Sequence, residues 1–167
     1  VRGLTATNIV ENGDFRDGVS PFMGDRATLS LILKGVLVTK GVDSDYGGIL
    51  FPPDTFLGGN KYYSKTKAKV TSGNCSSFRF RLAGGYGDIN QTTPIQGQLY
   101  NLSRTFTTPT DVNNNRGYIY FNAIDANQPL TAEVYEIMLI NLTQTFGAGN
   151  EPTVEECDLI FSDYFEG

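Results

Sequence analysis

Strict alternation of polar and apolar residues is the feature that most restricts the fold of this chain. In the segment 61–71, three lysines fall on one face of an extended strand, and mainly apolar or small side chains fall on the other. The segment 77–82 repeats the pattern, with Arg79 and Arg81 outward and apolar residues inward. A turn-forming run, Ser72-Gly-Asn-Cys-Ser76, separates the two segments. The pattern predicts an antiparallel hairpin that carries the lysine and arginine rows side by side.

Five further segments have strand-like composition and are separated by turns rich in Gly, Asn and Pro: 28–39, 47–51, 98–108, 117–124 and 132–142. The segment 134–140 is apolar on both faces apart from Glu136, which predicts a central strand. A length of 167 residues fits one domain with its own core. We therefore expect an all-β fold, a two-sheet antiparallel β-sandwich of the jelly-roll type, over residues 1–146.

The C-terminal residues 147–167 have a different pattern, which predicts a Gly-rich connector and one short amphipathic α-helix. Thr153 followed by Glu156 forms a capping-box signature, which marks the start of the helix. The helix is expected to pack either against the sandwich or against a neighbouring domain. Its apolar face comprises Val154, Cys157, Ile160 and Phe161.

Composition excludes several classes of activity. The chain contains no histidine, which removes Ser–His and Cys–His nucleophile pairs and zinc sites that use histidine. Of the carboxylates that could serve glycoside hydrolysis, Glu133 and Glu136 stand three apart on a strand and are expected on opposite faces. We therefore expect that the protein is not an enzyme. Cys75 and Cys157 could form a disulfide, but two buried thiols are the preferred interpretation.

Charge is unevenly distributed along the chain. Residues 55–87 contain six lysines and arginines and no acid, whereas residues 122–167 contain nine acids and no base. The two regions could face each other in the fold, or the basic region could attract an anionic partner. A net charge of −5 without a recognised module argues against nucleic-acid binding. No apolar stretch reaches the roughly 20 residues of a membrane span, so we expect no membrane partner.

Four short motifs follow one another along the chain: Asn8-Ile-Val-Glu-Asn-Gly-Asp-Phe15, Gly59-Asn-Lys-Tyr62, Arg104-Thr-Phe-Thr107 and Tyr135-Glu-Ile-Met-Leu139. In residues and in order they resemble the motifs of jelly-roll carbohydrate-binding modules of the type attached to xylanases and cellulases. The resemblance covers residues 8–142. The resemblance implies a two-sheet sandwich that holds a saccharide without chemistry.

The tail carries a second resemblance. Ile140-Asn-Leu-Thr143, Phe146-Gly-Ala-Gly-Asn-Glu-Pro-Thr153 and Glu156-Cys-Asp-Leu-Ile-Phe161 are similar to a segment of tail, baseplate and tail-fibre proteins of phages that infect Gram-positive bacteria. The resemblance implies a virion domain that binds bacterial cell-wall or surface polysaccharide and contacts neighbouring tail domains. It also implies synthesis in the host cytoplasm without a signal peptide. The alternative is a structural or assembly domain of the tail that has no glycan ligand.

Saccharide binding requires an aromatic surface together with groups that hydrogen-bond hydroxyls. Alternation places three such residues on one face of a strand, and Arg79 and Arg81 could share their side of the sheet. Two further tyrosines, Tyr46 and Tyr86, are expected in Gly-flanked loops. The absence of tryptophan favours a pocket or groove for a branched or anionic glycan over a flat cellulose-binding surface. The candidate ligand-binding residues are Tyr118, Tyr120, Asn122, Arg79, Arg81, Tyr46 and Tyr86.

The family resemblance also implies a structural calcium ion between the entry motif and the last strand. In this chain the side-chain ligands would be Asp14 and Glu136. Arg16 stands where the family often has an acid, and an arginine beside the site would repel the ion. No cofactor is expected to be required, and calcium is retained only as an option.

Overall fold

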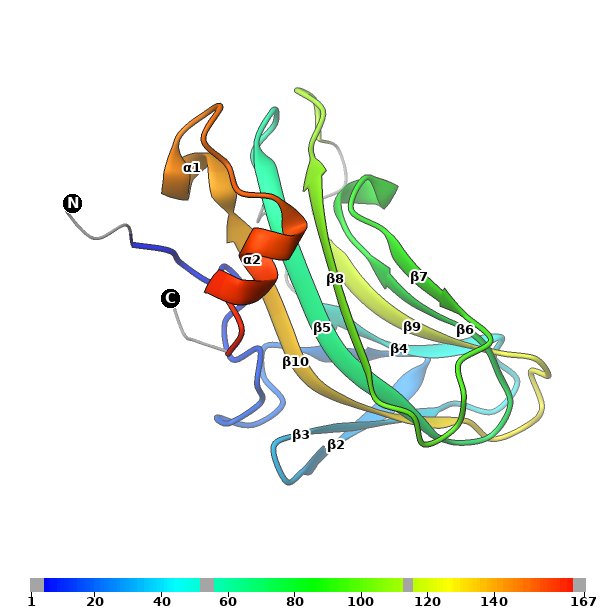
Figure 1. Ribbon diagram of the computed structural model, residues 1–167. Coiled ribbons are helices and arrows are strands. Elements are labelled where there is room, and N and C mark those ends of the chain that lie inside the picture. The colour runs from blue at the N-terminus through cyan, green and yellow to red at the C-terminus, as the bar shows by residue number, and fades with distance from the viewer. Residues whose placement is uncertain (1–4, 52–55, 113–115, 164–167) are drawn as a thin grey trace.

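Two five-stranded antiparallel sheets form the body of the molecule, which a computed structural model describes over residues 5–51, 56–112 and 116–163. The β9 sheet has the spatial order β1 (Met23–Asp25), β4 (Tyr46–Phe51), β9 (Gly117–Ala123), β6 (Cys75–Arg81) and β7 (Ile89–Thr92). The β10 sheet has the order β2 (Ala27–Ile32), β3 (Gly35–Lys40), β10 (Thr131–Asn141), β5 (Lys61–Ser72) and β8 (Tyr100–Thr107). The expected all-β sandwich is confirmed (Figure 1).

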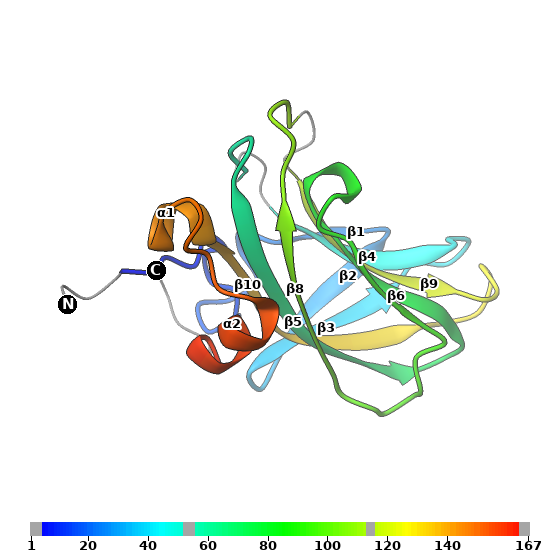
Figure 2. The same cartoon turned by 45° about the horizontal axis from the view of Figure 1, so that its top comes forward.

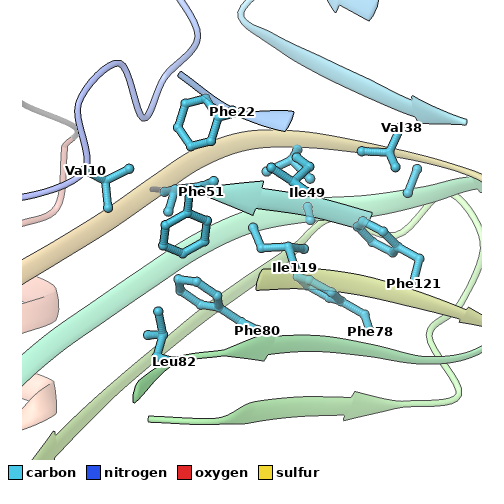
Figure 3. Packing of buried hydrophobic residues seen from close by; sticks show 14 of the residues in the cluster. Val10, Phe22, Val38, Ile49, Phe51, Phe78, Phe80, Leu82, Ile119 and Phe121 are labelled. Carbon is cyan, nitrogen blue, oxygen red and sulfur yellow. The ribbon is translucent and has the colours of Figure 1, made fainter. Parts of the chain in front are cut away.

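The inner faces of the two sheets bury the apolar positions of the alternating strands (Figure 3). Phe78 on β6 and Phe121 on β9 stack with ring centroids 5.0 Å apart, and Phe51 contacts Phe80 at 6.1 Å. Large aromatic side chains contribute most of the burial that stabilises such a core. Because period-two alternation sends the next residue to the other side, this core determines which residues of β9 and β6 face outward.

The outer face of the β10 sheet is covered by the C-terminal segment, which folds back as α1 (Leu142–Phe146) and α2 (Val154–Ile160) (Figures 1 and 2). The side chain of Thr153 and the Glu156 carboxylate form the expected capping box at the start of α2. A second apolar cluster joins the helices to the sheet; its buried members are Tyr63, Met138, Ile140, Leu142, Cys157 and Phe161. Within the described ranges, no helix is long and apolar enough to cross a membrane.

Lys65 joins the helix to the sheet, and we call its set of contacts the Lys65 latch. Its ammonium group donates to the carbonyl oxygens of Phe161 at 3.2 Å and Ser162 at 2.9 Å, and lies 3.4 Å from the Glu136 carboxylate. The Lys65 side chain is 4% exposed. Lys67 binds the second oxygen of Glu136 at 2.9 Å. At this surface, lysines from the basic middle of the chain therefore neutralise a glutamate of the acidic end. The arginines of the basic middle take no part in these ion pairs.

The predicted hairpin between residues 61–71 and 77–82 is wrong. β5 pairs with β10 and β8 in one sheet, whereas β6 pairs with β7 and β9 in the other. The turn after Ser72 carries the chain from one sheet to the other, so the lysine and arginine rows lie on opposite outer surfaces of the sandwich. Alternation predicts which face of a strand is buried, but it does not distinguish a hairpin from a crossing between sheets.

Other elements differ in detail from the expectations. The segment 28–39 is two strands, β2 and β3, because the chain reverses at Leu33 and Lys34, where Lys34 adopts a φ of 60°. The short edge strands β1 and β7 gave no sequence signal. The C-terminal region has two short helices where one was expected, since Asn141 caps the N-terminus of α1 by accepting a bond from the Gln144 amide.

The expectation that Glu133 and Glu136 point to opposite faces is also wrong. The register of β10 against β5 shifts between Val134 and Glu136, which marks a bulge. Both carboxylates consequently lie on the outer face, where Glu133 binds Lys69 at 3.1 Å and Glu136 binds the other lysines of the row.

The two cysteines are free and buried, as preferred from the sequence. Cys75 packs in the core between the sheets, whereas Cys157, a residue of α2, packs in the second apolar cluster between α2 and the β10 sheet. The boundary placed at residue 146 stays a prediction.

Candidate ligand-binding face

The outer face of the β9 sheet collects six of the seven candidate residues, and we call them the tyrosine–arginine face. Tyr118, Tyr120 and Asn122 alternate along β9 with the buried Ile119 and Phe121. In the register of the sheet, Tyr46 on β4 is opposite Asn122, Arg79 on β6 is opposite Tyr120, and Arg81 is opposite Tyr118. All six side chains are half-buried. The face comprises Tyr46, Arg79, Arg81, Tyr118, Tyr120 and Asn122.

The three tyrosine rings of this face pack against one another. Tyr118 and Tyr120 stack with centroids 5.1 Å apart, and Tyr46 meets Tyr120 edge-on at 4.7 Å. Gly48, opposite Tyr120 on β4, leaves room for this arrangement, because a Cβ there would lie 2.8 Å from the Tyr120 ring. The sequence reasoning did not identify Gly48 as part of the site.

Polar contacts at the edge of the face hold Tyr46 in place. Its hydroxyl donates to the Asp25 carboxylate at 3.3 Å, and the Arg26 guanidinium lies 4.8 Å from its ring centroid. Burial raises the pKa of the Tyr46 hydroxyl, and the nearby Asp25 raises it further. Burial raises the pKa of Tyr120 as well, so both phenols remain neutral and can donate hydrogen bonds at ordinary pH.

The amide of Asn122 is oriented by β6. Its Nδ2 donates to the Ser77 hydroxyl at 2.8 Å, and the Ser76 hydroxyl donates to the main-chain carbonyl of Asn122 at 3.2 Å. The amide therefore presents a defined polar group at the end of the tyrosine row. Asp25, Arg26 and Ser77 were not selected from the sequence, because only the pairing of strands distant in sequence brings them to the site.

Tyr86 is not part of this face. It follows the 3₁₀ turn η1 (Ala83–Gly85) after β6 and is 55% exposed, as expected for a loop tyrosine. Among the contacts of the described residues, none joins it to Tyr118 or Tyr120. Tyr46 was expected in a loop, but it is the first residue of β4, and this position in the sheet places it beside Asn122.

The residues proposed for calcium do not fit the ion. Arg16 binds Asp14 at 2.6 Å, and Lys65 and Lys67 bind Glu136, so cations already contact both carboxylates. Calcium requires six to eight oxygen ligands without competing cations. Throughout the described ranges, no group of three or more acidic, cysteine or histidine side chains could hold a metal ion.

Two cavities lie away from the tyrosine–arginine face. One, of about 590 Å³, is on the β10-sheet side, between the entry segment and the β2–β3 hairpin; its lining includes Phe15, Leu31, Lys67, Tyr135 and Glu136. A second, of about 530 Å³, lies beside α2. Neither cavity is lined by residues of the tyrosine–arginine face, and the pocket or groove expected from the absence of tryptophan stays a prediction.

Comparison of the fold with solved structures identifies carbohydrate-binding modules. The N-terminal cellulose-binding domain of Cellulomonas fimi β-1,4-glucanase C matches with a TM-score of 0.54 and 14% identity, over 79% of this chain and 95% of that domain. The C-terminal family 22 carbohydrate-binding module of Clostridium thermocellum Xyn10B matches with a TM-score of 0.51 and 17% identity, over 84% and 98% of the two chains. This chain therefore has the fold of these modules.

A phage protein shares the fold as well. The enzymatically active domain of bacteriophage CBA120 tailspike protein 4 matches with a TM-score of 0.52 and 16% identity, over 79% of this chain and 21% of that one. No protein-family model matches the sequence, and no curated protein matches it. At these identities the similarity describes the fold and does not extend to the ligand.

Proposed function

We propose that this chain is a non-catalytic carbohydrate-binding module of a phage tail or tail-fibre protein, and that it binds host cell-surface saccharide. The observation that carries the proposal is the tyrosine–arginine face on a fold shared with carbohydrate-binding modules. The proposed ligand is polysaccharide of the bacterial wall or surface, and the proposed location is the virion.

The face has the chemical groups that saccharide binding requires. Aromatic rings contact the apolar side of a pyranose, and neutral phenols, an oriented amide and guanidinium groups hydrogen-bond its hydroxyls. Tyr118 stands at the end of the ring stack and Asn122 at the other end of the same strand. Strand residues hold these groups more rigidly than loops, which reduces the entropy lost on binding.

The phage context is supported by the tail motifs and by the match to a tailspike domain. A tail carries many copies of its accessory proteins, so weak binding at one face would be multiplied by avidity. The proposal therefore does not require high affinity of an isolated domain.

The experiment that tests the proposal is a glycan array followed by calorimetric titration with host wall polysaccharide. Replacing Tyr118 by alanine should weaken binding about tenfold or more, as for an aromatic side chain that contacts the ligand. Tyr135→Ala, on the opposite sheet, is the matched control and should bind normally. Weak binding to every glycan, unchanged in Tyr118→Ala, would refute the proposal, and a loss in Tyr135→Ala alone would move the site to the 590 Å³ cavity.

The alternative, an assembly domain of the tail, receives less support from the helix than the sequence suggested. The expected docking face of α2 is used within the domain, because Cys157 and Phe161 are buried against the β10 sheet. Leu159 and Ile160 remain 81% and 54% exposed and border the smaller cavity. Binding of a tail protein that is lost in Leu159→Ser, with no glycan bound, would favour assembly.

A further inference from the structure

The two arginines of the tyrosine–arginine face differ from the lysines of the opposite face in having no acidic partner. Among the described residues, ion pairs join Asp14 to Arg16, Glu136 to Lys65 and Lys67, and Glu133 to Lys69. Neither Arg79 nor Arg81 takes part in one. A chain with 18 acidic and 13 basic residues thus leaves two adjacent guanidinium groups unpaired on one surface.

Two acids border this surface, and each accepts a hydrogen bond from a group other than an arginine. Asp25 lies on β1, three strands from β6, and the two backbones are about 14 Å apart at the usual strand spacing. The Asp25 carboxylate accepts a hydrogen bond from the Tyr46 hydroxyl. Asp88 lies beyond the end of β6, where one carboxylate oxygen accepts a hydrogen bond from the main-chain amide of Leu82 at 3.2 Å. Its other oxygen and a guanidinium nitrogen of Arg81 each lie 3.9 Å from the position that a Cβ on Gly85 would occupy, but the two groups form no ion pair. The β6 side of the face is therefore positive even though the whole chain carries a net charge of −5.

The positions of the arginines suit an anionic group attached to a sugar. Arg79 is flanked by Tyr120 on β9 and by Asn90 on β7, and Arg81 is flanked by Tyr118. The backbone of each arginine is thus one strand spacing, roughly 5 Å, from the backbone of a tyrosine of the ring row. A planar guanidinium forms paired hydrogen bonds with a carboxylate or phosphate, which is a geometry that a neutral hydroxyl does not match.

From this arrangement we infer that the ligand is an acidic saccharide, whose carboxylate or phosphate groups bind Arg79 and Arg81 while its sugar rings contact the tyrosines. The inference rests on the proposed function and specifies its ligand class. A single-stranded nucleic acid also combines stacking rings with phosphates, but the small number of basic side chains on this face and the net negative charge of the chain favour the saccharide.

The test compares an acidic oligosaccharide with its neutral ester and adds two probes that carry phosphate groups. Titrations of the full chain use oligogalacturonate, its methyl ester as the neutral match, an oligomer of glycerol phosphate, and a single-stranded oligonucleotide. The inference requires that the chain bind at least one acidic saccharide probe about tenfold or more tightly than the ester, since each charge-assisted pair supplies at least that factor. Preference for oligogalacturonate identifies a carboxylate ligand, and preference for the glycerol phosphate oligomer identifies a phosphate ligand.

The variant Arg79→Gln/Arg81→Gln removes the charges and keeps most of each side chain. It should weaken binding of the acidic probe far more than binding of the ester, so that the preference for the acidic probe is lost. Lys34→Gln/Lys67→Gln removes the same charge on the opposite surface and should keep the preference. Thermal unfolding of each variant establishes that it is folded, and Arg79→Lys/Arg81→Lys, which retains the charge, replaces the glutamine variant if that one does not fold; it should lose most of the preference through the lost paired geometry.

Several outcomes overturn the inference. Equal binding of acidic probe and ester, both weakened by Tyr118→Ala, would leave the proposed function in place and remove the acidic ligand. Preference retained in the double arginine variant, or tighter binding of the oligonucleotide than of any saccharide, would also contradict it. Binding to neither acidic probe refutes it as well, and the glycan array then decides separately whether the chain binds saccharide at all.

Discussion

Replacing Lys65 by methionine gives the most direct test of how the C-terminal helix is held. Methionine fills a similar volume but carries no charge, so the carbonyl oxygens of Phe161 and Ser162 lose their donor. Glu136 then keeps only Lys67, at 2.9 Å, as its partner. The substitution isolates the Lys65 latch without opening a large cavity.

The size of the effect follows from the burial of the group. Breaking a buried ion pair by removing one partner costs about 3–5 kcal/mol, and the remaining bond to Lys67 places the expected loss near the lower end, about 3 kcal/mol. For a domain of this size, that corresponds to a fall of about 6–12 °C in Tm. The matched control is Lys67→Met. Because the Lys67 side chain is 30% exposed, this substitution should lower the free energy of unfolding by about 1 kcal/mol or less.

Urea unfolding and calorimetry measure these changes, and limited proteolysis reports release of the helix. The double variant Lys65→Met/Glu136→Leu should recover most of the stability, since it removes the buried carboxylate that the single variant leaves with one partner. A loss below 1 kcal/mol in Lys65→Met, or a double variant less stable than the single one, would refute the reasoning.

Three further predictions concern pH, helix capping and calcium. Burial raises the pKa of Cys75 to about 11 and of Cys157 to about 12, both from 9.0. The folded chain therefore keeps these protons where the unfolded chain loses them, and the stability they provide is complete below pH 9 and falls as pH rises toward 12. Urea titrations at pH 9 to 11 should show this decline, and a decline equally steep in Cys75→Ala/Cys157→Ala would contradict it. Thr153→Ala should lose about 1 kcal/mol in thermal unfolding through the lost cap, and no change would mean that the helix end is already frayed. Calcium should leave Tm equal to its value in chelator, because cations already contact Asp14 and Glu136, and an increase of several degrees would show that the ion displaces them.

The sequence was sufficient to predict the layers of this fold, because alternation reports burial directly. The segments around Phe78, Phe80 and Phe121 point their apolar residues inward as predicted, and β10 is the central strand of its sheet. The capping box at Thr153 was predicted equally well, since its signal lies within four residues. Features that depend on local contacts could therefore be predicted from the sequence alone.

Strand pairing between segments distant in the sequence could not be predicted in this way. No local sequence pattern indicates that β5 and β6 belong to different sheets. Because a turn-forming run separates the two strands, the local pattern predicts a hairpin instead. The bulge at Tyr135 was missed for a similar reason, because one additional residue moves Glu136 to the face of Glu133 without changing the composition.

The candidate site was predicted more successfully than the pairing that creates it. Tyr118, Tyr120 and Asn122 share a face by alternation alone, and the structure adds Arg79 and Arg81 from the neighbouring strand, as anticipated. Tyr46 joins them because β4 borders β9, whereas Tyr86 does not. Binding by these residues stays a prediction.

The fold also determines how the domain can be presented to a ligand. The entry segment at Ala6 and the helix α2 both pack on the outer surface of the β10 sheet, so both described ends of the chain lie on that side (Figures 1 and 2). The tyrosines and arginines lie on the far side of the sandwich, separated by two sheets about 10 Å apart. A tether at either end, on a sensor chip or a particle, would hold the protein by its back and leave those side chains facing the solution.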